Sequence, residues 1–137
     1  MFTQHINTRR NAGMLKKWWN DIITRDNKNY QLSPALYVSG VPVIIKTQYD
    51  AFYKTNLAKL LETQKIKQLV ITGVMTNLCC ETTARNAFVR GFEIFFVVDG
   101  TATQNELMHW ATLVNLSYGF AIPVLTEEII NCFKRKC

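Results

Sequence analysis

The chain has 137 residues, of which 48% are hydrophobic, and its 16 Lys and Arg against 10 Asp and Glu give a formal net charge of +6. This length suits one domain with its own core and is too short for two. The basic residues form short groups far apart, at 9–10, 16–17 and 134–136, without a helix-turn-helix, zinc or aromatic signature, so we expect no nucleic-acid partner.

The first half of the chain contains the parts of a βα unit. Residues 1–5 predict the end of a strand, residues 14–24 an amphipathic helix with Trp18 and Trp19, and residues 26–40 a polar loop or lid. Residues 42–46 predict a short strand. The leucines that recur within residues 56–64 then predict a helix.

The second half alternates apolar strands with amphipathic helices. Strands are predicted at 67–73, 93–99 and 121–125, and helices at 79–89, 105–118 and 126–133. Strands this apolar are typical of a parallel sheet covered by helices on both faces. The sequence therefore predicts an α/β fold, a three-layer α/β/α Rossmann-like parallel sheet, in a single domain over residues 1–137.

The four cysteines are Cys79, Cys80, Cys132 and Cys137. Sequence neighbours such as Cys79 and Cys80 rarely bridge each other, so a disulfide framework is not expected. The sequence has no charged-then-apolar signal pattern and no apolar run of ~18 residues. We therefore expect a cytoplasmic protein with reduced thiols and no membrane partner.

Cys79 is the candidate nucleophile, because it opens a helix directly after a buried strand. Backbone N–H groups and the helix dipole favour a thiolate there, and the strand ends of a parallel sheet form the crevice where ligands bind. The turn before Cys79 could supply N–H groups for an oxyanion hole. Cys80, about 100° further round the helix, should face the core. On these grounds alone, a small buried hydrophobic Cys79 remains an alternative.

The segments around Cys79 carry a family resemblance. The run GVMTNLCCETTARNAF at 73–88, then RGF at 90–92 and DGTAT at 99–103, resembles the signature of the isochorismatase-like cysteine hydrolases. That family includes nicotinamidases, N-carbamoylsarcosine amidohydrolases and ureidoacrylate-type amidases. The resemblance continues through KTQYDAF at 46–52 and FTQH at 2–5, so it covers essentially the whole chain.

The resemblance implies a catalytic triad of Asp, Lys and Cys and a small amide substrate. By position, Cys79 corresponds to the nucleophile and Lys46 to the lysine, whose ammonium would lower the pKa of the thiol. The family's cis peptide would fall between Val74 and Met75, and the N–H groups of Met75 and Cys79 would form the oxyanion hole. The implied hydrolysis passes through a thioester and uses no cofactor.

The triad aspartate has no counterpart here, and Asp99 matches a position that more often caps a loop. We expect that the chain lacks roughly thirty residues at its N-terminus, the size of a βα unit. It would then be a fragment, a sequence with a misassigned start or a degenerate copy. Activity should then be weak. The alternative is a non-catalytic member that serves ligand binding or oligomer assembly, and homo-oligomers are expected in either case.

The resemblance and the aromatic residues suggest a substrate pocket, and its predicted members are His5, Trp18, Trp19, Tyr49 and Phe52. At least one of the two tryptophans is expected in the core. The resemblance also implies a metal site, because related nicotinamidases bind a metal through an Asp and histidines near the strand of His5. Here Gln4 precedes His5 and two of those ligands are missing, so no metal is expected. The other histidine, His109, is predicted to be a packing residue.

Overall fold

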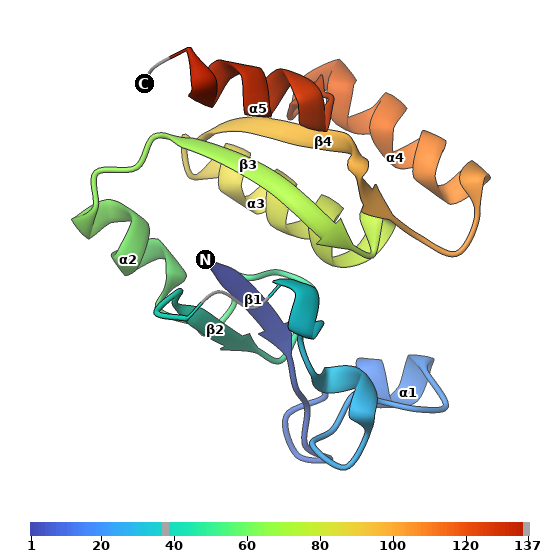
Figure 1. The fold of residues 1–137 in the computed structure, drawn as a ribbon. Coiled ribbons are helices and arrows are strands. Elements are labelled where there is room, and N and C mark those ends of the chain that lie inside the picture. The colour runs from blue at the N-terminus through green and yellow to red at the C-terminus, as the bar shows by residue number, and fades with distance from the viewer. Residues whose placement is uncertain (37–38, 136–137) are drawn as a thin grey trace. The chain divides into compact units, whose positions relative to one another are not determined.

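The computed structural model describes residues 1–36 and 39–135 (Figure 1). The chain forms two compact units, Met1–Leu60 and Leu61–Cys137, which are described one at a time. Within the described residues, strands pair into two parallel sheets, one in each unit. None of the described helices has the length and apolar character needed to cross a membrane.

The first unit is built on two parallel strands, β1 (Phe2–His5) and β2 (Val43–Lys46). Their register pairs His5 with Lys46, so both side chains stand at the carboxyl ends of the strands. The predicted loop at 26–40 contains two turns of 3₁₀ helix, Lys28–Tyr30 and Pro34–Leu36. Helix α2 (Leu57–Thr63) begins in this unit and ends in the next.

The helix predicted over residues 14–24 is wrong in length, because α1 covers only Leu15–Trp18. Trp19 has an extended backbone, and the β-branched residues at 22–24 favour such a conformation over a helix. A single turn buries one side chain, Leu15, and leaves Trp18 76% exposed. Trp19 is exposed too, so the expectation that one tryptophan lies in the core is also wrong.

The second unit is a three-stranded parallel sheet with helices packed against it. Its strands, in the order β3-β4-β5, are Gln68–Val74, Glu93–Ala102 and Ile122–Val124. The helices are α3 (Glu81–Val89), α4 (Glu106–Gly119) and α5 (Thr126–Lys134). Strand β4 runs three residues past its predicted end, because Thr101 and Ala102 pair with Gly73 and Val74 beyond an irregularity. The predicted α/β class with parallel strands is confirmed.

The helices of this unit pack on its sheet, α3 and α5 on the central strand β4 and α4 on β5. Both crossovers run in the same direction across the sheet, so right-handed connections place α3 and α4 on one face. The two helices are in contact, with the rings of Phe88 and Phe120 5.4 Å apart. Helix α5 packs on β4, and Figure 1 shows it across the sheet from α3. Ile94, Phe96 and Val97 of β4 form the centre of the core.

Candidate active site

Strand β3 leads directly into the segment that carries Cys79. The peptide bond between Val74 and Met75 is cis, at the position that the family resemblance implies. Residues Thr76–Cys80 then form a π-helical turn, in which the Met75 carbonyl accepts from the N–H groups of Leu78 and Cys80 at 3.1 and 3.2 Å. The helix predicted to begin at Cys79 therefore begins three residues earlier. Cys79 still lies in its first turn, where backbone N–H groups and the dipole favour an anion.

The two neighbouring cysteines have different surroundings. Cys80 is buried, and its thiol lies 3.9 Å from the Thr72 carbonyl of β3. Cys79 is half-buried. This difference confirms the expectation that Cys80 faces the core. A reagent of small size should therefore reach Cys79 more readily than Cys80.

The residues just before Cys79 are anchored by hydrogen bonds. Thr76 is completely buried, and its hydroxyl lies 3.1 Å from Nδ1 of His109 on α4. The Asn77 side-chain carbonyl accepts from the Thr103 hydroxyl at 2.6 Å. His109, predicted to be a packing residue, thus has a polar partner as well, because its ring reaches the π-helical turn.

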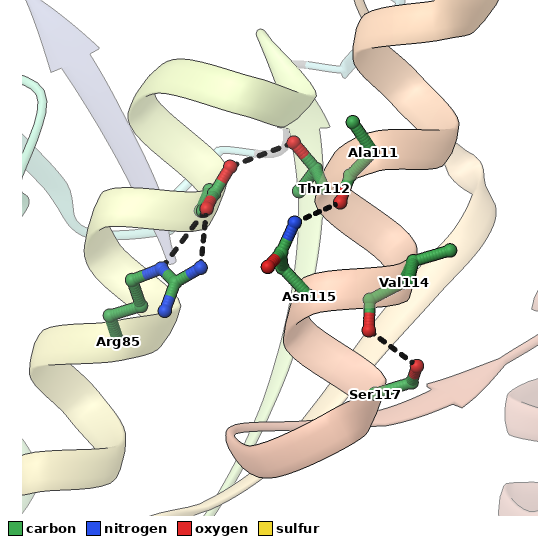
Figure 2. A network of polar contacts seen from close by, with 7 residues as sticks. Arg85, Ala111, Thr112, Val114, Asn115 and Ser117 are labelled. Atoms are coloured by element: carbon green, nitrogen blue, oxygen red, sulfur yellow. Dashed lines mark hydrogen bonds and ion pairs between the residues drawn. The ribbon is translucent and has the colours of Figure 1, made fainter.

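The residue two positions after Cys79 anchors the segment from the other side. The Glu81 carboxylate accepts two bonds from the Arg85 guanidinium, at 2.8 and 3.0 Å. Its other oxygen accepts from the Thr112 hydroxyl of α4 at 2.7 Å, as Figure 2 shows. The guanidinium also lies over the Phe120 ring, 4.3 Å from its centre. The negative charge of Glu81 is therefore compensated within the second unit.

In the first unit, Lys46 is buried at the end of β2. Its ammonium donates to the carbonyls of Gln48 and Tyr49 at 2.8 and 2.9 Å. A buried ammonium needs such partners, because removing it from water without them would be costly. The two carbonyls thus hold the Lys46 side chain at the carboxyl end of the strand.

His5 lies beside Lys46 in the strand register, and its Nε2 is 2.8 Å from the Asn7 side-chain oxygen. Buried Asn7 in turn donates to the Thr47 carbonyl at 2.8 Å. Burial, and then the charge of Lys46, lower the pKa of His5 below its usual 6.5. His5 is therefore neutral at pH 7.

The aromatic residues of the predicted pocket differ in burial. The Trp19 indole N–H donates to the Tyr49 hydroxyl at 2.6 Å. Phe52 is buried, whereas Trp18 projects from α1 into solvent. The structure thus joins Trp19 to Tyr49 and leaves Trp18 outside this contact. Their role toward a substrate stays a prediction.

Two of the aspartates, Asp99 and Asp50, serve as local caps. Asp99 accepts from the N–H and the hydroxyl of Thr126, at 2.8 and 2.9 Å, at the start of α5. The Thr126 N–H lowers the pKa of this exposed carboxyl. Asp50 accepts from the Phe52 N–H at 2.9 Å. The capping role expected for Asp99 is confirmed.

A metal-ligand cluster or a surface hollow would be a further sign of a site among the described residues. Over residues 1–36 and 39–135, no group of three or more His, Cys, Asp or Glu side chains is placed to hold a metal ion. A hollow in the second unit is lined by residues 65–68, Gly91 and Glu93, at the amino ends of β3 and β4. Cys79 follows the opposite end of β3.

The hydrogen bond of His5 with Asn7 in the first unit was not predicted from the sequence. In the second unit, the hydrogen bonds of Thr76 with His109 and of Glu81 with Thr112 were not predicted either. Thr76 and Glu81 could have been noticed because they flank Cys79 at a spacing of three and two residues. Their partners on α4 carry no such signal, since about thirty residues separate them from the Cys79 segment.

The fold and the Cys79 turn define a class of protein, the parallel α/β domains with a cysteine at a strand-to-helix turn. The model of the Isochorismatase domain family matches residues 1–128. The chain therefore belongs to the isochorismatase family.

Individual relatives agree with this assignment. Nicotinamidase 3 of Arabidopsis thaliana is 46% identical over 133 residues, which are 93% of this chain and 67% of that protein. Enterobactin synthase component B of Escherichia coli is 30% identical, over 85% of this chain and 41% of its own length. An isochorismatase-like hydrolase from Alkaliphilus metalliredigens superposes with a TM-score of 0.87 at 25% identity, covering 96% of this chain and 71% of that one.

Proposed function

We propose that the protein is a cysteine-dependent hydrolase of a small amide, with Cys79 as the nucleophile. The observation that carries this proposal is the half-buried Cys79 in the first turn of the helix after β3. A small hydrophobic cysteine would serve packing, but Cys80 already fills that role beside it. The alternative, a non-catalytic member, differs from this proposal in one property, the reactivity of the Cys79 thiol.

The chemistry follows from the thiolate. Sulfur attacks the amide carbon, and the N–H groups of Met75 and Cys79 are proposed to hold the oxyanion. The C–N bond then breaks, and the nitrogen leaves with the proton that the thiol gave up. Water attacks the thioester next, releasing the acid and restoring the thiol. These steps require no cofactor.

The proposed partners of Cys79 rest on the family pattern. Lys46 is proposed as the cation that stabilises the thiolate, and a buried ammonium suits that task because it is weakly screened. None of the four aspartates in the sequence matches the family's proton-transfer residue. We propose that transfer of the thiol proton to the leaving nitrogen limits the rate and that turnover is slow.

The proposed substrate is a primary amide on a small aromatic ring. The 46% identity to a nicotinamidase favours nicotinamide over the ureido compounds that other relatives hydrolyse. His5, Trp19, Tyr49 and Phe52 are the proposed pocket residues, with Trp18 as a flanking residue. A neutral His5 can exchange hydrogen bonds with an uncharged amide.

Iodoacetamide labelling separates the catalytic proposal from the non-catalytic alternative. At pH 6.5 we expect Cys79 to be alkylated faster than Cys80, Cys132 and Cys137, because it is the proposed nucleophile and lies in the first turn of a helix, where backbone N–H groups face an anion. Replacing Lys46 by methionine should slow labelling of Cys79 roughly tenfold, because the proposed site then lacks the cation that stabilises the thiolate. Mass spectrometry of the digested protein gives the rate at each site.

The matched control for Lys46 is Lys17→Met, which removes an exposed lysine of α1 and should leave the rates unchanged. Equally slow labelling of all four cysteines would support the non-catalytic member. If Cys79 is labelled at the same rate in Lys46→Met as in the native chain, Lys46 does not belong to the proposed site.

We also propose that the protein is a cytoplasmic homo-oligomer whose subunits meet at the outer face of α4. Leu107, Trp110, Val114 and Tyr118 recur at helical spacing on this face, and each is more than half exposed. Together they supply an apolar strip of several hundred Å², on the order of the ~800 Å² that each partner buries in a stable interface. The strip carries no charge, so a second copy can meet it without like-charge repulsion.

Light scattering coupled to gel filtration tests this contact. We expect an oligomer for the native sequence and a monomer for Trp110→Glu, because two carboxylates would meet in the apolar interface. Trp18→Glu places the same charge on another exposed tryptophan and should leave the mass unchanged. A monomeric native chain, or an oligomer that tolerates Trp110→Glu, would argue against this face.

A further inference from the structure

Three side chains of α4 reach the segment that carries Cys79: Met108 accepts from the Asn77 amide, and His109 and Thr112 contact residues before and after Cys79 in the sequence. His109 lies 3.1 Å from the hydroxyl of Thr76, three residues before Cys79. Thr112 donates to the carboxylate of Glu81, two residues after it, at 2.7 Å. His109 and Thr112 are three residues apart, which places them on the same face of the helix, one turn from each other.

Both contacts are of the kind that is costly to lose. Thr76 and Thr112 are buried, so water cannot easily replace a lost partner. The Thr112 bond is also charge-assisted, since its acceptor is a carboxylate. Elsewhere on α4 the hydroxyl of Ser117 donates only to the carbonyl of Val114 in its own helix, as Figure 2 shows.

We propose that His109 and Thr112 are positioning residues, which hold the Cys79 segment at two points so that the thiol stays at the carboxyl end of β3. Neither residue is required to touch the substrate. The proposal deepens the proposed function, and only its kinetic readout rests on that function.

The two contacts act on Cys79 in different ways. The Thr76 contact fixes the turn whose N–H groups are proposed to face the oxyanion, and displacements of about 1 Å at such a site can cost a hundredfold in rate. The Glu81 contact joins this carboxylate of α3 to Thr112 of α4, while Arg85 of α3 pairs with its other oxygen. Without it, the carboxylate keeps its pair with Arg85 but loses its tie to α4, and a shift toward the thiol two residues away would oppose a thiolate.

Paired substitutions test the proposal. Thr112→Val removes the hydroxyl at constant shape and Thr112→Ser keeps it, while His109→Leu removes the polar ring and His109→Asn keeps a polar atom near Nδ1. The first readout is the rate of Cys79 alkylation by iodoacetamide from pH 5.5 to 9. The second is kcat and KM for nicotinamide, and Ser117→Ala is the control.

We expect Thr112→Val to slow Cys79 labelling at pH 7 about fivefold and to lower kcat similarly, with KM within about twofold. His109→Leu should lower kcat at least about threefold. Thr112→Ser, His109→Asn and Ser117→Ala should stay within about twofold of the native chain. Urea unfolding of each variant identifies any loss that comes from folding alone.

Failure of the two proposals can be told apart. A native chain that labels Cys79 selectively but releases no ammonia from nicotinamide would overturn the substrate proposal, and the labelling rates would still test the positioning role. The positioning role would be overturned if Cys79 were labelled at the native rate in both Thr112→Val and His109→Leu. It would also be overturned if Thr112→Ser and His109→Asn lost as much labelling rate and kcat as the other two variants. The two pairs are independent, so one variant that fails to fold leaves the other to decide.

Discussion

Replacement of Cys79 by alanine is expected to lower kcat/KM for a small aromatic amide by at least about a thousandfold, because no other group in the mechanism can form the thioester. The half-buried thiol in the first turn after β3 is the residue on which every proposed step acts. Ammonia release from nicotinamide, measured with a coupled assay, gives the rate for each variant.

The neighbouring cysteine is the matched control for this experiment. Cys80→Ala removes a buried thiol from the same turn, and we expect a loss of about 1 to 2 kcal/mol in the free energy of unfolding with kcat/KM nearly unchanged. An active Cys79→Ala variant would contradict the nucleophile assignment. If Cys80→Ala were folded but inactive, Cys80 and not Cys79 would be assigned as the nucleophile.

Replacement of Phe96 by alanine is expected to lower the free energy of unfolding by about 3 to 5 kcal/mol, since the change leaves a cavity in the core of the second unit. Phe96 is almost completely buried in β4, the strand between β3 and β5. Urea unfolding followed by circular dichroism measures the effect.

Phe133→Ala is the control for Phe96, because that phenylalanine of α5 is mostly exposed. We expect it to change the free energy of unfolding by less than about 0.5 kcal/mol. A loss below about 1 kcal/mol for Phe96→Ala would mean that the second unit does not depend on the core described for β4.

The strands and helices after residue 66 could be predicted well from the sequence, because local patterns determine them. Apolar runs at 67–73 and 93–99 and the helix between them match β3, β4 and α3 closely. The helix predicted at 14–24 is wrong in length, because the β-branched residues in its second half favour an extended backbone despite the amphipathic spacing. Whether such a segment is helical or extended depends on its tertiary contacts and not on its periodicity alone.

The candidate site was predictable only in part, for a related reason. Cys79 and its turn lie within one short motif. Cys80 is buried and Cys79 is less so because successive helix residues point about 100° apart. The contacts of Thr76 and Glu81 with α4 join residues 33 and 31 positions apart in the chain. Such contacts depend on how α3 and α4 pack, which the sequence pattern does not reveal.

Trapping of the acyl-enzyme tests the proposed role of Cys79 most directly. The protein is mixed with nicotinamide, quenched in acid within a turnover and digested, and the peptide that contains Cys79 is weighed by mass spectrometry. The proposed mechanism predicts a nicotinoyl group on Cys79 that is absent from Cys80 and lost on longer incubation. Ammonia release without any acyl group on Cys79, at a rate that Cys79→Ala retains, would contradict it.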